Sequence, residues 1–78
     1  MNYIATFHTH FGAMTFKRKA EKLNIPCQMA PVPRKLSASC GVCVMFNTEI
    51  DVNSLNSKDL YGIYSIDNDT FNLIFENE

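Results

Sequence analysis

The stretch YIATFHTHFGAMTFKRKAEKLN, residues 3–24, joins a β-branched and aromatic run to an amphipathic one. Its first five residues, 3–7, are of the types that favour a strand. Thr9 can then cap a helix, and apolar residues recur at helical spacing between charged ones. Those apolar positions are Ala13, Phe16, Ala20 and Leu23. Asn24 and Pro26 end the helix, because the residue before a proline avoids the helical conformation. The stretch predicts a strand followed by a helix with one buried face.

Four more strands and a second helix are predicted beyond this stretch. The strands are residues 27–31, 41–46, 61–66 and 70–76. The last two are joined by Asp67-Asn68-Asp69, residue types that tolerate the left-handed conformations of tight hairpins. The second helix is predicted over Val52–Lys58, with Asp51 or Asn53 as its cap. The order β-α-β-β-α-β-β is typical of a small α+β two-layer sandwich of the ferredoxin-like type, with an antiparallel-rich sheet and both helices on one face.

Length and composition indicate one globular domain, residues 1–78. Hydrophobic residues make up 46% of the chain, which is enough for a packed core rather than a disordered segment. No run approaches the roughly 18 apolar residues of a membrane span, and the first residues lack the pattern of a signal peptide. We therefore expect a cytoplasmic protein that does not associate with membranes. Its three cysteines are expected as thiols, because a disulfide framework normally needs an even number.

The charged residues are distributed unevenly along the chain. Residues 1–48 carry six cationic side chains and one carboxylate, and residues 49–78 carry seven carboxylates and one lysine, so the net charges are +5 and −6. This asymmetry indicates either a face that attracts anions or simply a solvated basic helix beside acidic loops. The run Lys17-Arg18-Lys19 lacks interleaved aromatic residues, so nucleic acid is not expected as a partner.

Alternation along the predicted strands indicates two apolar sheet faces. Val42, Val44 and Phe46 share one face of the third strand, and Phe71, Leu73 and Phe75 share one face of the last strand. The opposite faces hold Cys43, Met45, Tyr64, Ile66 and Ile74. Because no helix is left to cover this second face, we expect a homodimer.

The segment PVPRKLSASCGVCVMF, residues 31–46, carries the chemistry of the chain. Cys40 stands where a proline-stiffened loop becomes a strand. Two cations, two hydroxyls and a glycine surround it: Arg34, Lys35, Ser37, Ser39 and Gly41. A nearby cation lowers the pKa of a thiol and raises its thiolate fraction, so the segment predicts a reactive Cys40. The alternative is that Cys40 is a small apolar residue at the start of a strand.

Cys40 and Cys43 have CxxC spacing, but the second cysteine falls inside a predicted strand. Residues three apart in a strand point to opposite faces, and no second CxxC is present. No metal and no cofactor are therefore expected. Cys43 and Cys27 are interpreted as packing residues. His8 and His10 flank the helix start, and nothing in the sequence places either beside Cys40 as a general base.

The residues IATFHTHFGAM, AEKL and MAPVPRKLSASCGVCVMF resemble a small family of bacterial proteins described as selenium/sulfur carrier-like. The specific part is Pro31-x-Pro33-Arg34-x-Leu36-Ser37-x-Ser39-Cys40-Gly41. The resemblance implies that Cys40 is the carrier thiol and that Arg34, Ser37, Ser39 and Gly41 form its surroundings. Cys43 departs from the family pattern, in which small or aliphatic residues are usual, and is either a resolving thiol or a packing variant.

Three functions are consistent with these features. In the first, Cys40 accepts a persulfide-type group from a sulfur- or selenium-donating enzyme and passes it to an acceptor protein, as a carrier rather than an enzyme. In the second, the loop binds a small anion or senses redox state without covalent transfer. In the third, the loop only shapes the interface of a dimer.

Overall fold

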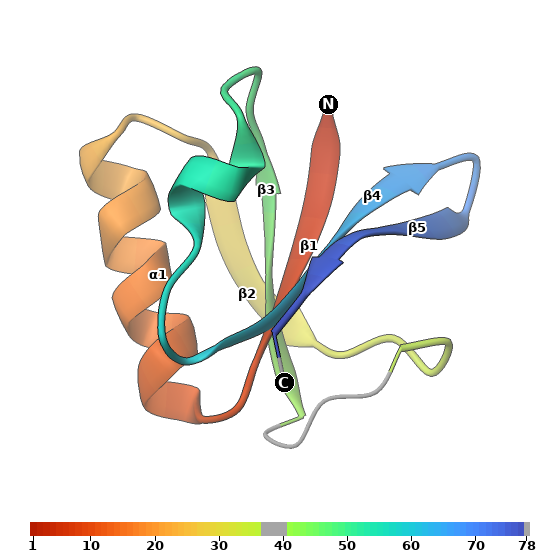
Figure 1. The fold of residues 1–78 in the computed structure, drawn as a ribbon, viewed down its shortest axis with the longest axis horizontal. Helices are drawn as coiled ribbons and strands as arrows, with labels where there is room; N and C mark the ends of the chain where they lie inside the picture. The colour runs from red at the N-terminus through yellow and green to blue at the C-terminus, as the bar shows by residue number, and fades with distance from the viewer. Residues whose placement is uncertain (37–40, 78) are drawn as a thin grey trace.

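The computed structural model describes residues 1–36 and 41–77 of the chain. It contains five strands, one α-helix and one 3-10 helix (Figure 1). In chain order these elements are β1 (Asn2–Phe7), α1 (His10–Lys22), β2 (Cys27–Pro31), β3 (Val42–Asn47), η1 (Val52–Leu55), β4 (Leu60–Asp67) and β5 (Thr70–Glu76). The five predicted strands and the first helix are confirmed, with boundaries that differ by one or two residues.

The strands form one sheet in the order β2-β3-β1-β4-β5, and every neighbouring pair is antiparallel. The α+β class is therefore confirmed. The ferredoxin-like arrangement is not, because this strand order differs from that of the ferredoxin-like fold and because the described residues form one α-helix against the sheet, not two. β1 occupies the centre of the sheet and is the most protected strand, with Ile4, Ala5, Thr6 and Phe7 all buried.

Helix α1 covers one face of the sheet, over β1, β2 and β3 (Figure 1). Thr9 caps it as predicted, since its side-chain oxygen accepts a hydrogen bond from the backbone N–H of Gly12 at 3.1 Å. Phe16 anchors the helix to the sheet, with ring centroids 5.2 Å from Phe7 and 5.3 Å from Phe46. Neither α1 nor η1 is long and apolar enough to cross a membrane.

The second predicted helix is wrong in type and length. Where residues 52–58 were expected to form an α-helix, the chain makes the four-residue 3-10 helix η1. Asp51 caps it as predicted, accepting from the N–H of Asn53 at 3.0 Å. Ser54 donates its hydroxyl to the carbonyl of Asp51 at 2.6 Å, a local bond of the kind that competes with helix propagation. Burial of Val52 and Leu55 in the core retains this single turn.

The prediction that Phe71, Leu73 and Phe75 share one face is also wrong. The pairing of β4 with β5 shifts between Ile63 and Tyr64, so Phe75 lies opposite Ile63 and Leu73 lies opposite Tyr64. Ile63 belongs to the core beneath the helix, and Phe75 packs against that core. Leu73 follows Tyr64 to the other face and is 53% exposed. One extra residue in a strand therefore reverses the alternation on which the prediction relied.

Candidate functional site

The segment predicted to carry the chemistry connects β2 to β3. The N–H of Val32 donates to the carbonyl of Gly41 at 3.1 Å and closes this hairpin beyond the last strand pair. On the β2 side, the N–H of Leu36 donates to the carbonyl of Pro33 at 3.0 Å and forms a tight turn. Ser37, Ser39 and Cys40 lie outside the described residues. Their predicted roles therefore stay predictions.

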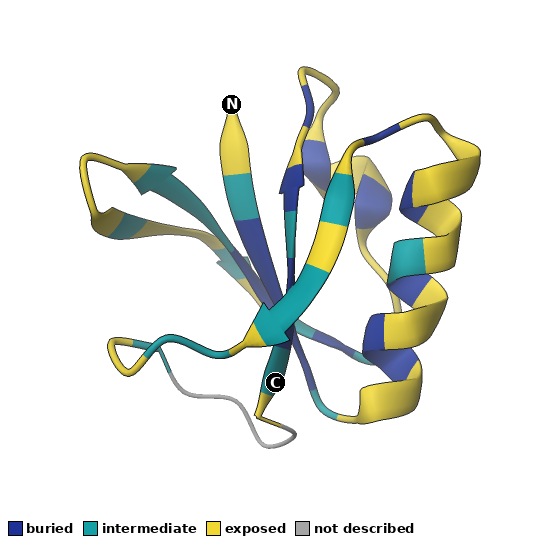
Figure 2. Cartoon of the chain, turned by 180° about the vertical axis from the view of Figure 1, so that it is seen from behind, coloured by how far each residue is buried: buried dark blue, intermediate teal, exposed yellow. Residues whose placement is uncertain are grey.

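Arg34 and Lys35 lie on the face of the sheet opposite α1, which we call the helix-free face. Both are exposed, and the Lys35 ammonium donates to the backbone carbonyl of Asp69 at 3.4 Å. Asp69 belongs to the turn between β4 and β5, so the Pro33-Arg34-Lys35 segment extends across to the far hairpin. Figure 2 shows this segment on the side of the sheet away from the helix. Within the described part of the chain, neither cation is in an ion pair.

Gly41 has a backbone conformation that explains the residue type. Its φ is +73°, in the left-handed region where side chains are disfavoured. It is exposed, and a Cβ added there would have no atom within 4 Å from the described residues other than its chain neighbours. The position that follows Cys40 in the chain thus combines a glycine-dependent turn with open space.

Cys43 lies within β3, where it is fully buried on the helix-free side of the sheet. It pairs across strands with Thr6 and Ala30, and its sulfur lies 3.7 Å from the carbonyl of Pro31. A thiol in this position can be attacked only if the covering chain moves. Burial therefore favours packing over a resolving role for Cys43.

Cys27 begins β2 and is half-buried between the sheet and α1. Its thiol donates to the carbonyl of Lys17 at 3.8 Å. Burial raises the pKa of this thiol, the Glu21 carboxylate raises it further, and the Lys17 ammonium opposes both. Cys27 is therefore the opposite of an activated thiol, in agreement with its interpretation as a packing residue. Cys27 and Cys43, the two cysteines of the described residues, do not form a disulfide with each other.

One cluster was not predicted from the sequence. The Asp59 carboxylate lies at the first turn of α1, where it accepts a hydrogen bond from the Thr9 hydroxyl. The backbone carbonyl of Asp59 accepts from the N–H of His8 at 3.0 Å. A Cβ at Gly12 would lie 2.6 Å from Cγ of Asp59, so the glycine makes room for this contact. The cluster ties the start of the helix to the start of β4; the only sequence signal was a glycine in the first helical turn.

The fold and the segment between β2 and β3 define a small α+β domain with a cysteine-bearing hairpin connection. A family model described as "Putative Se/S carrier protein-like" matches residues 2–58, and the chain belongs to this family. The matched residues run from β1 through η1, so β4 and β5 lie beyond them. No curated protein and no solved structure matches the chain.

Proposed function

We propose that this protein is a sulfur or selenium carrier that uses Cys40 as its carrier thiol. Membership of the selenium/sulfur carrier-like family carries the proposal. The matched residues include the whole Pro31-to-Gly41 segment, and that segment contains one cysteine. The open space at Gly41 supports it, because a carrier thiol must meet two partner proteins in turn.

The transfer is an exchange of one sulfur atom between thiols. The Cys40 thiolate attacks the outer sulfur of a persulfide on the donor enzyme, a new S–S bond forms, and the donor thiolate leaves. An acceptor thiolate then attacks the outer sulfur of the Cys40 persulfide and regenerates the Cys40 thiolate. No external oxidant is needed, because the transferred sulfur keeps its oxidation state. Selenium would follow the same sequence of steps.

Two cations are available to stabilise the Cys40 thiolate. Arg34 and Lys35 are exposed, stand six and five residues earlier in the chain, and have no carboxylate partner among the described residues. A free cation near a thiol lowers the pKa of that thiol and increases the thiolate fraction at neutral pH. The proposed roles of Ser37 and Ser39 are hydrogen-bond donors to the same thiolate.

The first experiment measures the alkylation rate of each cysteine against pH, with peptide mapping to separate Cys40 from Cys27 and Cys43. We expect Cys40 to react with an apparent pKa below the ordinary value of about 8.5. Cys27 serves as the internal comparison, because its raised pKa predicts reaction only at higher pH. A Cys40 that reacts no faster than Cys27 at neutral pH would contradict an activated carrier thiol.

The second experiment tests transfer itself. The protein is incubated with a cysteine desulfurase and cysteine, and intact mass reports the gain of one sulfur atom. Cys40→Ser should abolish loading, whereas Cys43→Ser should retain it because the buried Cys43 thiol is not the acceptor. Loading that persists in Cys40→Ser would overturn the proposal.

A further inference from the structure

The helix-free face of the sheet has an apolar floor that the other residues of the described ranges, 1–36 and 41–77, cover only in part. Ile4 forms its centre and is 1% exposed. Met45 lies opposite Ile4 across the β1–β3 pair, and Ile66 and Phe71 are paired on β4 and β5. The last three side chains are half-buried. An apolar surface of this kind can bind a hydrocarbon group while every strand of the sheet stays paired.

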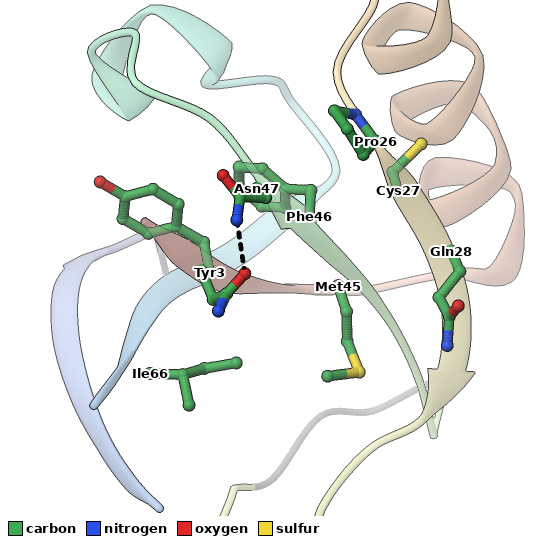
Figure 3. A pocket seen from close by; sticks show the side chains of 9 residues that line it. Tyr3, Pro26, Cys27, Gln28, Met45, Phe46, Asn47 and Ile66 are labelled. Atoms are coloured by element: carbon green, nitrogen blue, oxygen red, sulfur yellow. Dashed lines mark hydrogen bonds between the residues drawn. The ribbon is translucent and has the colours of Figure 1, made fainter. Parts of the chain in front are cut away.

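Two adjoining hollows lie over this floor and share Met45 and Ile66. One, of about 470 Å³, reaches from Ile4 and Phe71 to Pro33, Arg34, Lys35 and Asp69. The other, of about 520 Å³, reaches the amide side chains of Asn2, Gln28 and Asn47, and its lining also includes Tyr3, Pro26, Cys27 and Phe46. Figure 3 shows Met45 between Ile66 on one side and Gln28 on the other. The two hollows together form a groove with an apolar middle, a cationic end and an amide-lined end.

The cationic end has positive charge that the described residues do not neutralise. Arg34 is exposed and has no ion pair within the described ranges. Lys35 is held at the groove by the carbonyl of Asp69, a neutral acceptor. Asp69 supplies the single carboxylate among the residues that line this end, against two cations. The charge at the rim therefore favours an anionic group directly beside an apolar floor.

We infer that this groove binds an organic carboxylate with a short hydrocarbon body. The carboxylate lies at Arg34 and Lys35, and the hydrocarbon lies over Met45 and Ile66. An inorganic anion would contact only the two cations, and a neutral hydrocarbon would contact only the apolar residues. The inference goes beyond sulfur or selenium transfer and does not depend on Cys40, although it uses the same two cations that the carrier proposal assigns to the Cys40 thiolate. The residues that line the groove come both from the family-matched range, 2–58, and from β4 and β5, which lie outside that range.

The methionines of the chain provide a direct test. The protein is labelled with ¹³C at the methionine methyl groups and titrated with hexanoate, with 1-hexanol and with acetate. We expect hexanoate to shift the Met45 methyl resonance until the shift saturates. 1-Hexanol, which lacks the carboxylate, and acetate, which lacks the hydrocarbon body, should shift the same resonance far less. Met14, exposed on α1, and Met29, which packs on the helix side of the sheet, should not respond. Equal responses to hexanoate and hexanol, or a response of Met14 equal to that of Met45, would overturn the inference.

Matched variants test the role of the rim. Arg34→Gln and Lys35→Gln should each weaken hexanoate binding by about tenfold, since each removes a charge-assisted contact. Arg18→Gln, which removes an exposed cation on α1, should leave the affinity unchanged. Unchanged Met14 and Met29 resonances in each variant show that the fold is retained. Affinities that stay equal in all three variants would overturn the inference.

Two further outcomes separate this inference from its alternatives. Cys40→Ser should bind hexanoate at least as tightly as the natural chain does, because it removes a thiolate that would share Arg34 and Lys35, whereas the same variant should lose sulfur loading, so the groove and the carrier function fail separately. If instead the Met45 resonance moves with protein concentration and without hexanoate, a second copy of the chain covers the face and the inference is overturned.

Discussion

At the scale of single residues, the first turn of α1 depends on the absence of a side chain at Gly12. Its missing side chain leaves space for Asp59, whose carboxylate is bonded to the Thr9 hydroxyl while Thr9 caps the helix. A carboxylate near a helix N-terminus is also favoured by the helix dipole. Sequence reasoning identified Thr9 as the cap because that signal is local. It missed Asp59 because fifty residues separate the two side chains.

Gly12→Ala should destabilise the fold by about 1–2 kcal/mol. The added Cβ would lie 2.6 Å from Cγ and 2.7 Å from Cβ of Asp59, and overpacking of this kind outweighs the gain in helix propensity. The midpoint of urea unfolding measures the change. In an Asp59→Gly background the same Gly12→Ala substitution should be neutral or stabilising. An equal loss in both backgrounds would contradict the steric explanation.

At the scale of elements, the parts of the fold that local patterns specify were predictable. The Thr9 cap, the burial of Ala13, Phe16 and Ala20 on α1 and the Asp67-Asn68-Asp69 turn all depend on neighbours in sequence, and all were confirmed. Leu23, predicted for the same buried face, is 50% exposed, because α1 ends at Lys22 and Leu23 is its C-cap. The turn residues Asn68 and Asp69 do adopt positive φ. The bulge in the β4–β5 pair and the shortening of the second helix were not predictable, because pairing register and core contacts decide them.

The candidate site divides in the same way. Cys40, Arg34 and Gly41 were singled out from one continuous segment, and the family to which the chain belongs was recognised from that segment. The groove on the helix-free face was not anticipated. It needs the β2–β3 connection to reach the β4–β5 turn, and that contact joins Lys35 to Asp69 across 34 residues. The same contact also covers part of the face that was expected to drive dimerisation, and the homodimer stays a prediction.

Helix α1 contains two phenylalanines whose different environments predict very different losses of stability when each is replaced by alanine. Phe16 is 4% exposed between Phe7 and Phe46, whereas Phe11 is 76% exposed. Phe16→Ala should cost about 3–5 kcal/mol, because it leaves a cavity between helix and sheet. Phe11→Ala should change stability by less than about 0.5 kcal/mol. Chemical denaturation of the two variants checks both values, and similar losses would mean that α1 does not pack through its Phe16 face.

At the scale of the whole molecule, a small sheet is protected unequally on its two sides. One side is covered by α1 and η1, which complete the core. Among the described residues, the other side is covered by the segment that carries Arg34 and Lys35, and Tyr64, Ile66 and Phe71 are half-buried there. The side covered by α1 and η1 therefore determines the stability of the fold, and the helix-free face has room for a ligand. The unequal cover also leaves ionisable groups partly buried on both sides, Tyr64 on one and Cys27 on the other.

These two groups predict a loss of stability at alkaline pH. Burial raises the pKa of the Tyr64 phenol, with Glu76 and then Tyr61 raising it further, and burial likewise raises the pKa of the Cys27 thiol. Folding therefore favours the neutral form of each group. Their contribution to stability is full below the ordinary pKa values of the thiol and the phenol, and it declines as pH rises through the higher pKa values of the folded state.

Urea unfolding followed from neutral pH to about pH 11 measures this decline. Tyr64→Phe and Cys27→Ser should each make the decline shallower, and the double variant should make it shallower than either alone, because the side chains lie on opposite sides of the sheet and act independently. Deprotonation of lysines destabilises or stabilises all four proteins alike, so the difference in slope isolates the two groups. Parallel declines in all four proteins would show that neither the phenol nor the thiol is held neutral by the fold.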